Sequence, residues 1–192
     1  LVQAAIGQVV GTEELGGAKM HAEISGTVDF HEKDDSACLE KIRKLVELLP
    51  PQQILENEEI LSERDPKLLY DYISADGKRA YDARDLLACI IDKDSFIEYK
   101  EEYGKTLVTA YAKISGIPVG IIANQRKSTT TGDGQIEVGG VIYADSADKA
   151  ARFVMDCNQT KLPLIFIQDV MGFMVGKEAE ESGIIKSGAK LV

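Results

Sequence analysis

The hydrophobic pattern near the C-terminus predicts a strand followed by a glycine-containing loop. The run Leu164–Ile167 has no polar residue and therefore predicts a short strand that is buried on both faces. The strand ends at Asp169, and Gly172 and Gly176 follow before a helical pattern resumes at Lys177. In layered α/β proteins, ligands bind where the carboxyl end of a strand opens into such a loop. The two glycines allow a close backbone approach to a ligand, although an ordinary connection that needs positive φ explains them equally well.

Apolar residues that recur at three- and four-residue steps predict three helices. The clearest starts at the carboxylates of Asp34 and Asp35 and ends at Pro50, while Asp82 can cap a second helix and Ser146 a third. We expect the apolar positions of these helices to face inward. They are Cys38, Leu39, Ile42, Leu45, Val46 and Leu49 in the first helix, Leu86, Leu87, Ile90 and Ile91 in the second, and Ala147, Ala150, Phe153, Val154 and Cys157 in the third.

Three further runs, Ser95–Tyr99, Leu107–Ile114 and Ile117–Ala123, predict strands. A Ser-Gly pair separates the last two, so we expect them to form an antiparallel hairpin. The stretch 126–139 is rich in glycine, serine and threonine, a composition typical of mobile surface loops. The order of elements indicates an α/β fold in which helices cover a largely buried sheet.

The N-terminal part of the chain and the centre of the sequence carry weaker patterns. The first 29 residues are glycine-rich and predict loops with one short helix capped by Thr12. Residues 51–77 are acidic with few large apolar side chains, and we interpret them as a linker that lies on the surface. Since Leu1 and Val192 both fall inside apparent elements, we expect the sequence to be a piece of a longer protein.

The composition and the net charge of the chain exclude some classes of binding partner. The 192 residues are 44% hydrophobic and 28% charged, with a net charge of −10, which argues against nucleic acid as a partner. No apolar run approaches the length of a membrane span. The cysteines Cys38, Cys89 and Cys157 form no closely spaced pair, so we expect three buried, reduced side chains. With only two histidines, no metal site is expected.

Side chains suited to catalysis are scarce. No serine or cysteine has the sequence setting of an activated nucleophile. Asp169 could act as a general base, although a carboxylate at a strand end more often caps the following turn. The chemistry that the pattern favours depends on the backbone, because glycine-flanked loops at strand ends are suited to an oxyanion hole.

Motifs spread over nearly the whole chain resemble one enzyme family. They are Glu13–Ala18, Gly26, Asp34–Asp35, Lys78–Asp82, Tyr103–Gly104, Leu107–Thr109, Val119–Asn124, Asp145–Phe153, Asp169–Gly176, Gly183–Ile184 and Gly188–Lys190. In this order they resemble the carboxyltransferase (β) subunit of biotin-dependent acyl-CoA carboxylases. The sequence of residues 172–176 is most similar to the methylcrotonyl-CoA and geranyl-CoA branch, and that of residues 145–151 to the propionyl-CoA branch. The motifs therefore do not identify the acyl group of the substrate.

The resemblance implies a crotonase (ClpP)-like layered β/α superhelix, of which this chain holds a part. Residues 1–50 would be the C-terminal end of the N-terminal carboxyltransferase domain and residues 51–77 the linker. Residues 78–192 would be the first part of the C-terminal crotonase-like domain.

The resemblance also implies a reaction, its cofactor and its partners. The family transfers a carboxyl group between carboxybiotin, held on a partner carrier domain, and an acyl-CoA. A biotin carboxylase or biotin carboxyl carrier subunit is the expected partner, and a hexamer of the full-length chain is the expected assembly. The expected location is the cytoplasm, or the mitochondrial matrix of a eukaryote.

The same resemblance limits what this chain can do alone. The glycine-rich oxyanion segments of the family are expected outside residues 1–192, so no catalytic residue is expected within the chain and the chain alone should be inactive. Asp169, Gly172, Phe173 and Gly176 are expected to border the biotin and acyl pocket, the glycines through backbone access and Phe173 through apolar contact. Packing of Phe173 in the core is an equally good interpretation.

Three alternatives stay open. The chain could belong to the α subunit of a biotin-dependent acyl-CoA decarboxylase of the glutaconyl-CoA type. It could instead be a non-catalytic assembly module whose acidic linker and hydrophobic helices make subunit contacts. A biotin-independent crotonase hydratase or isomerase would need an acidic side chain at the substrate α-carbon, and Asp169 is the one weak candidate.

Overall fold

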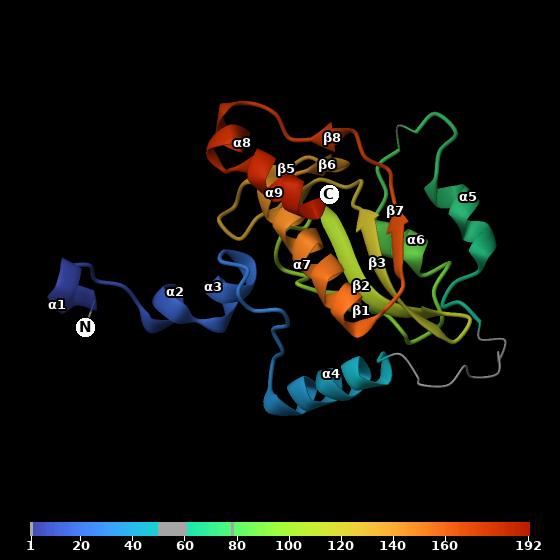
Figure 1. The fold of residues 1–192 in the computed structure, drawn as a ribbon, viewed down its shortest axis with the longest axis horizontal. Coiled ribbons are helices and arrows are strands. Elements are labelled where there is room, and N and C mark those ends of the chain that lie inside the picture. The colour runs from blue at the N-terminus through green and yellow to red at the C-terminus, as the bar shows by residue number, and fades with distance from the viewer. Residues whose placement is uncertain (1, 50–60, 78) are drawn as a thin grey trace.

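A four-stranded sheet lies at the centre of the computed structural model, which describes residues 2–49, 61–77 and 79–192 (Figure 1). The strands, in spatial order, are β1 (Ile97–Tyr99), β2 (Leu107–Ile114), β3 (Ile117–Asn124) and β7 (Leu164–Ile167). The first three are antiparallel neighbours, and β7 lies parallel to β3. The α/β class is therefore confirmed.

The predicted hairpin between β2 and β3 is confirmed. Its register runs from Leu107 opposite Asn124 to Ile114 opposite Ile117. Both turn residues have positive φ, 52° at Ser115 and 78° at Gly116, as in the tight turns that suit the twist of paired strands. The Asp92 carboxylate stabilises the turn by accepting hydrogen bonds from both of these backbone N–H groups.

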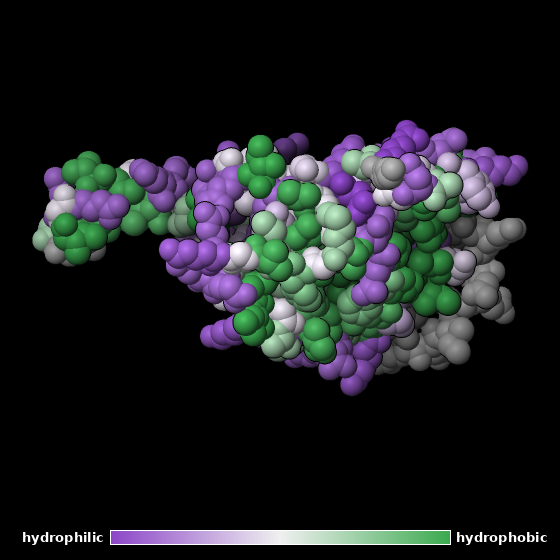
Figure 2. Space-filling view, turned by 90° about the horizontal axis from the view of Figure 1, so that it is seen from above, coloured by the Kyte–Doolittle hydropathy of each residue, from purple (hydrophilic) through white to green (hydrophobic). Residues whose placement is uncertain are grey.

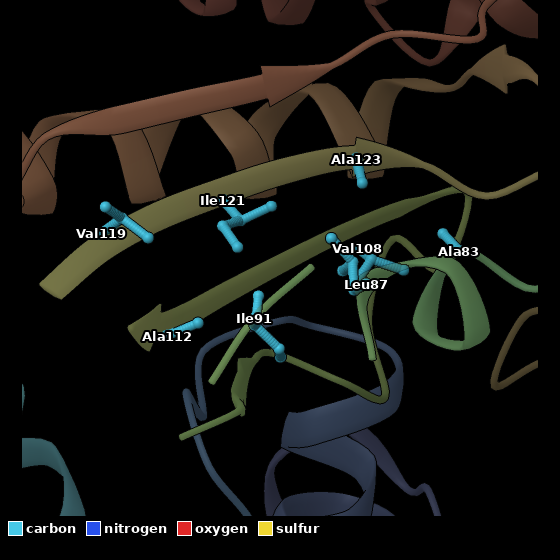
Figure 3. Close-up of a cluster of buried hydrophobic side chains, with 8 residues drawn as sticks. All are labelled: Ala83, Leu87, Ile91, Val108, Ala112, Val119, Ile121 and Ala123. Carbon is cyan, nitrogen blue, oxygen red and sulfur yellow. The ribbon is translucent and has the colours of Figure 1, made fainter. Parts of the chain in front are cut away.

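Helices cover both faces of the sheet. On one face α6 (Ala83–Leu87) and the residues after it pack on β2 and β3 (Figure 3). This first cluster comprises Ala83, Leu87, Ile91, Val108, Ala112, Val119, Ile121 and Ala123. On the other face α7 (Ala144–Thr160) packs on the sheet, and α9 (Ile184–Leu191) packs on α7. The second cluster comprises Tyr99, Leu107, Ile122, Ala150, Phe153, Cys157 and Leu162.

The inward face predicted for α7 is confirmed, and only its start differs. Ala147, Ala150, Phe153 and Cys157 are fully buried. The helix begins at Ala144, with Tyr143 as the N-cap residue. Ser146 therefore lies in the first turn, where its hydroxyl accepts a hydrogen bond from the Tyr143 N–H at 2.9 Å.

Shorter elements complete the described structure. Towards the N-terminus these are α1 (Val2–Ile6), α2 (Thr12–Gly16), α3 (Ala18–Glu23) and α4 (Asp35–Glu47). The others are η1 (Pro66–Leu68), α5 (Leu69–Tyr72), β4 (Thr129–Thr130), β5 (Ile136–Glu137), β6 (Val141–Ile142), β8 (Gly172–Phe173) and α8 (Lys177–Glu181). Within residues 2–49, 61–77 and 79–192, no helix is long and apolar enough to cross a membrane.

Several expectations for the first half of the chain need correction. Its first 29 residues hold three short helices instead of one, and Thr12 is the first helical residue of α2 while Gly11 is the N-cap. The expected linker falls partly on residues 50–60, which lie outside the described residues, and it stays a prediction. Of its described residues, 66–72 form η1 and α5, and Arg64 makes an ion pair of 2.8 Å with Asp85 of α6.

Helix α4 is confirmed, but the direction of its apolar face was predicted wrongly. Asp34 caps the helix by accepting a hydrogen bond from the Ala37 N–H at 2.8 Å. Leu39, Ile42, Val46 and Leu49 are nevertheless each exposed by half or more, because no element within the described residues packs over them. Lys41 instead turns toward the body of the protein, 3.0 Å from Glu32 and above the ring of Phe30.

Two expectations about burial are also wrong. Cys38 is exposed because it lies on α4, whereas Cys89 and Cys157 are buried as predicted. The strand β7 is confirmed but is not buried on both faces, since Phe166 is 49% exposed. β7 is the edge strand of the described sheet, and its other three residues are partly buried. Figure 2 shows one face of the molecule, on which hydrophobic patches lie beside hydrophilic ones.

Candidate functional site

Asp169 lies just beyond the carboxyl end of β7 and is held by three neighbours. The Tyr81 hydroxyl donates a hydrogen bond to Asp169 Oδ2 at 2.9 Å, and Arg126 Nε lies 3.3 Å from the same oxygen. The Asp169 N–H donates to Asn124 Oδ1 at 3.2 Å. Burial, and then the bond to Asp169, raises the pKa of Tyr81 to about 12, so the phenol keeps its proton at neutral pH. The arrangement suits a structural anchor better than a free general base.

The loop after Asp169 is fixed by a short parallel pairing with the segment that leads into α7. In this pairing β8 lies beside β6, with Gly172 opposite Val141 and Phe173 opposite Ile142. On either side of it, the Met171 N–H donates to Gly140 O at 2.7 Å and the Met174 N–H donates to Ile142 O at 2.8 Å. These two amides are therefore committed to the protein and cannot serve as oxyanion donors.

Both predicted glycines adopt backbone conformations that other residues rarely adopt. The φ angle is 145° at Gly172 and 112° at Gly176. A side chain at either position would meet no atom within 4 Å, so the space beside each glycine is open. Positive φ accounts for the choice of glycine, and the open space leaves the same backbone accessible to a ligand.

Phe173 is partly exposed and packs against α9. Its side chain is 40% exposed, and its ring packs on Gly188 of α9. A Cβ atom at Gly188 would lie 3.1 Å from Phe173 Cε1, so the absence of a side chain there lets the ring approach the helix. One part of the ring thus packs on α9 while another remains open to contact.

A cavity of about 670 Å³ opens next to Gly176, between the segment 131–137, the start of α7 and α8. Of the four predicted site residues, only Gly176 lines it; Asp169, Gly172 and Phe173 do not. Tyr103 and Tyr143 add aromatic surface. Six carboxyl groups line the cavity: Glu23, Asp133, Glu137, Asp145, Asp148 and Glu178. Among the described lining residues, Lys177 is the one lysine or arginine.

Buried charges lie at the base of this cavity. Burial, and then the neighbouring Asp145, raises the pKa of Glu137 to about 7. Burial also raises the pKa of Asp145 and lowers the pKa of the buried Lys149 to about 8. Farther inside, Arg84 makes two hydrogen bonds to the buried Glu98, of 2.7 and 2.8 Å. The carboxylates and the buried cations partly neutralise one another in this network.

Sequence patterns missed several residues of the site. Tyr81 and Asp145 lie in motifs that carried the family resemblance, so a signal for them existed. Arg126 and Glu137 lie in or next to the polar stretch that was interpreted as a surface loop. That stretch forms a short antiparallel ladder, with Thr129 opposite Glu137. No group of three histidine, cysteine or acidic side chains suited to a metal ion occurs in the described part of the chain.

Comparison with known proteins identifies the family. The carboxyl transferase domain matches residues 1–192. A methylcrotonoyl-CoA carboxylase beta chain, mitochondrial, from Dictyostelium discoideum is 40% identical over all of this chain and 31% of its own length. The methylmalonyl-CoA decarboxylase subunit alpha of Propionigenium modestum is 34% identical over all of this chain and 36% of its own length.

A solved structure shows the same architecture. The transcarboxylase 12S subunit, crystallised as a hexamer with methylmalonyl-CoA and methylmalonic acid bound, aligns with a TM-score of 0.84 and 35% identity. The alignment covers 98% of this chain and 35% of the 12S chain, so the crotonase-like fold implied by the resemblance is confirmed. The chain spans about a third of the length of these relatives. By sequence and by fold, it belongs to the carboxyl transferase domain family.

Proposed function

We propose that this chain is part of a carboxyltransferase that moves a carboxyl group between carboxybiotin, held on a partner carrier domain, and an acyl-CoA. The match of the carboxyl transferase domain over residues 1–192 is the observation that carries this proposal. The fold alignment with the 12S subunit, which binds methylmalonyl-CoA, supports the same substrate class.

The charge of the cavity favours the biotin side of the reaction. Six carboxyl groups and one lysine would repel the phosphates of coenzyme A, which carry several negative charges, more strongly than carboxybiotin, which carries one. Exposed apolar side chains of Phe173 and Val175 stand beside the open space at Gly172 and Gly176. These residues fit biotin, and the loop 172–176 would form one wall of its pocket, with the acyl-CoA approaching from another part of the assembly.

The residues of this chain would position the loop 172–176 and exclude water from the biotin pocket. Carboxybiotin supplies the carboxyl group when it is bound. The β6–β8 pairing holds the loop beside the segment that leads into α7. Asp169, which precedes the loop, is held by Tyr81, Asn124 and Arg126. As the family resemblance implies, the chemistry would depend on placed dipoles, the main ones outside this chain.

Partners and location follow from the same proposal. A biotin carboxylase or biotin carboxyl carrier subunit would deliver biotin, and the full-length protein would form a hexamer, as the 12S subunit does. Residues 1–50, 51–77 and 78–192 would be the end of one carboxyltransferase domain, a linker and the start of the next. The protein would act in the cytoplasm, or in the mitochondrial matrix if its source is a eukaryote, and the name of the Dictyostelium relative places that relative in mitochondria.

A second candidate concerns the direction of transfer. The similarity to a methylmalonyl-CoA decarboxylase alpha subunit supports transfer from acyl-CoA to biotin as an alternative, whereas the similarity to methylcrotonoyl-CoA carboxylase beta chains supports the reverse direction. The site does not separate the two directions, because one set of backbone contacts serves a reversible transfer both ways.

Decarboxylation of a panel of acyl-CoAs by the full-length protein tests the proposal. Malonyl-, methylmalonyl-, 3-methylglutaconyl- and glutaconyl-CoA are each supplied with and without free biotin. We expect one of them to lose its carboxyl group in a biotin-dependent manner, which also names the acyl group. No turnover of any substrate by a folded, full-length protein would contradict the proposal and favour the assembly module.

A further inference from the structure

We propose that Arg126 is the positioning residue of the loop 172–176, which it holds through Asp169. The significance of this loop for catalysis rests on the proposed function, but the positioning itself does not. Arg126 follows the end of β3, and its side chain is 14% exposed. Its guanidinium connects three segments that are far apart in the sequence.

The first connection is to Asp169. Arg126 Nε lies 3.3 Å from Asp169 Oδ2, the same oxygen that accepts the Tyr81 hydroxyl at 2.9 Å. The Asp169 backbone is held as well, since its N–H donates to Asn124 Oδ1. The carboxylate at the base of the loop is therefore fixed from β3 and from the segment before α6, both of which belong to the packed core.

The second connection is to the strand that pairs with the loop. The guanidinium of Arg126 fills the position that a side chain at Gly140 would occupy, and the Arg126 carbonyl does the same at Gly139. Gly140 also accepts the Met171 N–H through its carbonyl. Arg126 thus contacts the residues that precede both strands of the β6–β8 pairing, Gly140 before β6 and Asp169 before β8.

The third connection runs to Gly77, whose carbonyl accepts a hydrogen bond from Arg126 Nη2 at 3.2 Å. The contact brings the end of the segment 61–77 to the same guanidinium. A lysine could satisfy only one of these directions, because its ammonium is a point charge and the guanidinium is a planar fork. These contacts therefore require an arginine at position 126 and not a lysine.

Two buried donors next to Asp169 have no hydrogen-bond acceptor: Arg126 Nε, which is close to Oδ2 but poorly aligned, and Asn124 Nδ2. Buried donors without acceptors are costly, so this anchor is less stable than one in which every donor is hydrogen-bonded.

The chain offers a chemically matched control. Arg64 donates to the Tyr72 hydroxyl at 2.7 Å and to Asp85 at 2.8 Å, so it too forms an arginine–aspartate ion pair. This cluster joins the segment 61–77 to α6 and does not contact the loop 172–176. Arg126→Met and Arg64→Met therefore remove the same type of contact from two different places.

Hydrogen–deuterium exchange of the full-length protein tests the positioning without reference to activity. In Arg126→Met we expect the amides of Met171 and Met174 to exchange about tenfold faster or more, and in Arg126→Lys an intermediate amount, because the local opening of the loop becomes easier. In Arg64→Met these amides should exchange at the wild-type rate. Unchanged exchange of this loop in both Arg126 variants would overturn the inference. If Arg126→Met does not fold, the exchange of these amides in Arg126→Lys decides it.

Kinetics of biotin-dependent decarboxylation give the second readout. We expect Arg126→Met to raise the KM for free biotin and lower kcat/KM about 10–100-fold, as a misplaced binding loop does, and Arg126→Lys to recover part of the loss. Arg64→Met should leave the KM unchanged. An Arg126→Met enzyme with wild-type KM and kcat would contradict the proposed role. An inactive wild-type protein would refute the proposed function alone, since exchange still decides the positioning.

Asp169→Asn separates an anchor from a base. Asparagine keeps the shape and an oxygen that accepts the Tyr81 hydroxyl, so we expect kcat to remain within about tenfold of wild type. Loss of a general base costs about 100-fold or more. A loss of that size in Asp169→Asn, with normal exchange of the loop, would make Asp169 catalytic and overturn its assignment as an anchor.

Discussion

Helices α4 and α7 carry similar amphipathic patterns and have opposite surroundings. In α7 the apolar positions Ala147, Ala150, Phe153 and Cys157 are fully buried against the sheet and α9. In α4 the apolar positions Leu39, Ile42, Val46 and Leu49 are each at least half exposed. Helix α4 begins after its predicted cap Asp34, whereas α7 begins before its predicted cap Ser146, with Tyr143 as the N-cap residue.

The difference shows what helical periodicity can and cannot predict. Spacing of three and four residues determines which side chains share a face, and it did so correctly for both helices. It does not say what covers that face, because covering depends on residues distant in the sequence. For α7 those residues are β2, β3 and α9, while for α4 the described part of the chain supplies no such partner.

The largest expected effect is in α7. Phe153 packs against the rings of Tyr99 and Tyr111, with centroids 5.4 and 5.0 Å away. We expect Phe153→Ala to lower the free energy of unfolding by about 3–5 kcal/mol, because it removes a fully buried ring and leaves a cavity. Urea denaturation measures the change, and a loss below about 1 kcal/mol would show that the second cluster is not tightly packed.

A smaller effect is expected where α7 meets β3. A methyl group at Gly120 would lie 2.6 Å from Cys157 Sγ and 3.2 Å from Phe153 Cε1. Gly120→Ala should therefore lower the free energy of unfolding by about 1–3 kcal/mol through overpacking. The double variant with Cys157→Ala, which makes room for the methyl group, should recover part of that loss; no recovery would mean that the strain lies elsewhere.

The titration of Glu137 predicts a pH effect. The pKa of its carboxyl group is about 7 in the folded protein, above the ordinary value of 4.5, first because of burial and then because of Asp145. The folded state binds more protons between these values, so this contribution to stability is present at low pH and is lost as the pH rises through 7. With solvent screening we expect a loss of about 1–2 kcal/mol between pH 5 and pH 8. In Glu137→Gln this part of the pH dependence should be absent, and an unchanged profile would place the titration on other groups.

The smallest effect is expected on the exposed face of α4. Ile42 is 50% exposed, so Ile42→Ala should change the free energy of unfolding by less than about 0.5 kcal/mol. The measurement is the same urea titration that is used for Phe153→Ala. A loss of 2 kcal/mol or more in the full-length protein would mean that another part of that protein covers this face.

Sequence patterns predicted the elements of the fold better than the site. The hairpin turn at Ser115 and Gly116, the cap at Asp82 and the strand before Asp169 all depend on local chemistry, and all were found. Burial of Phe166 and Cys38 was predicted wrongly because it depends on distant partners. The same reason explains why Tyr81 and Arg126 were missed: their proximity to Asp169 arises only when β3 and β7 pair.

Transfer of an isotopically labelled carboxyl group tests the central claim most directly. The full-length protein is supplied with free biotin and the acyl-CoA that the panel selects, labelled with ¹³C in its carboxyl group. We predict that labelled carboxybiotin forms, and that its yield falls in Arg126→Met and is unaffected in Arg64→Met. Release of the label as bicarbonate at the same rate with and without biotin would contradict carboxyl transfer.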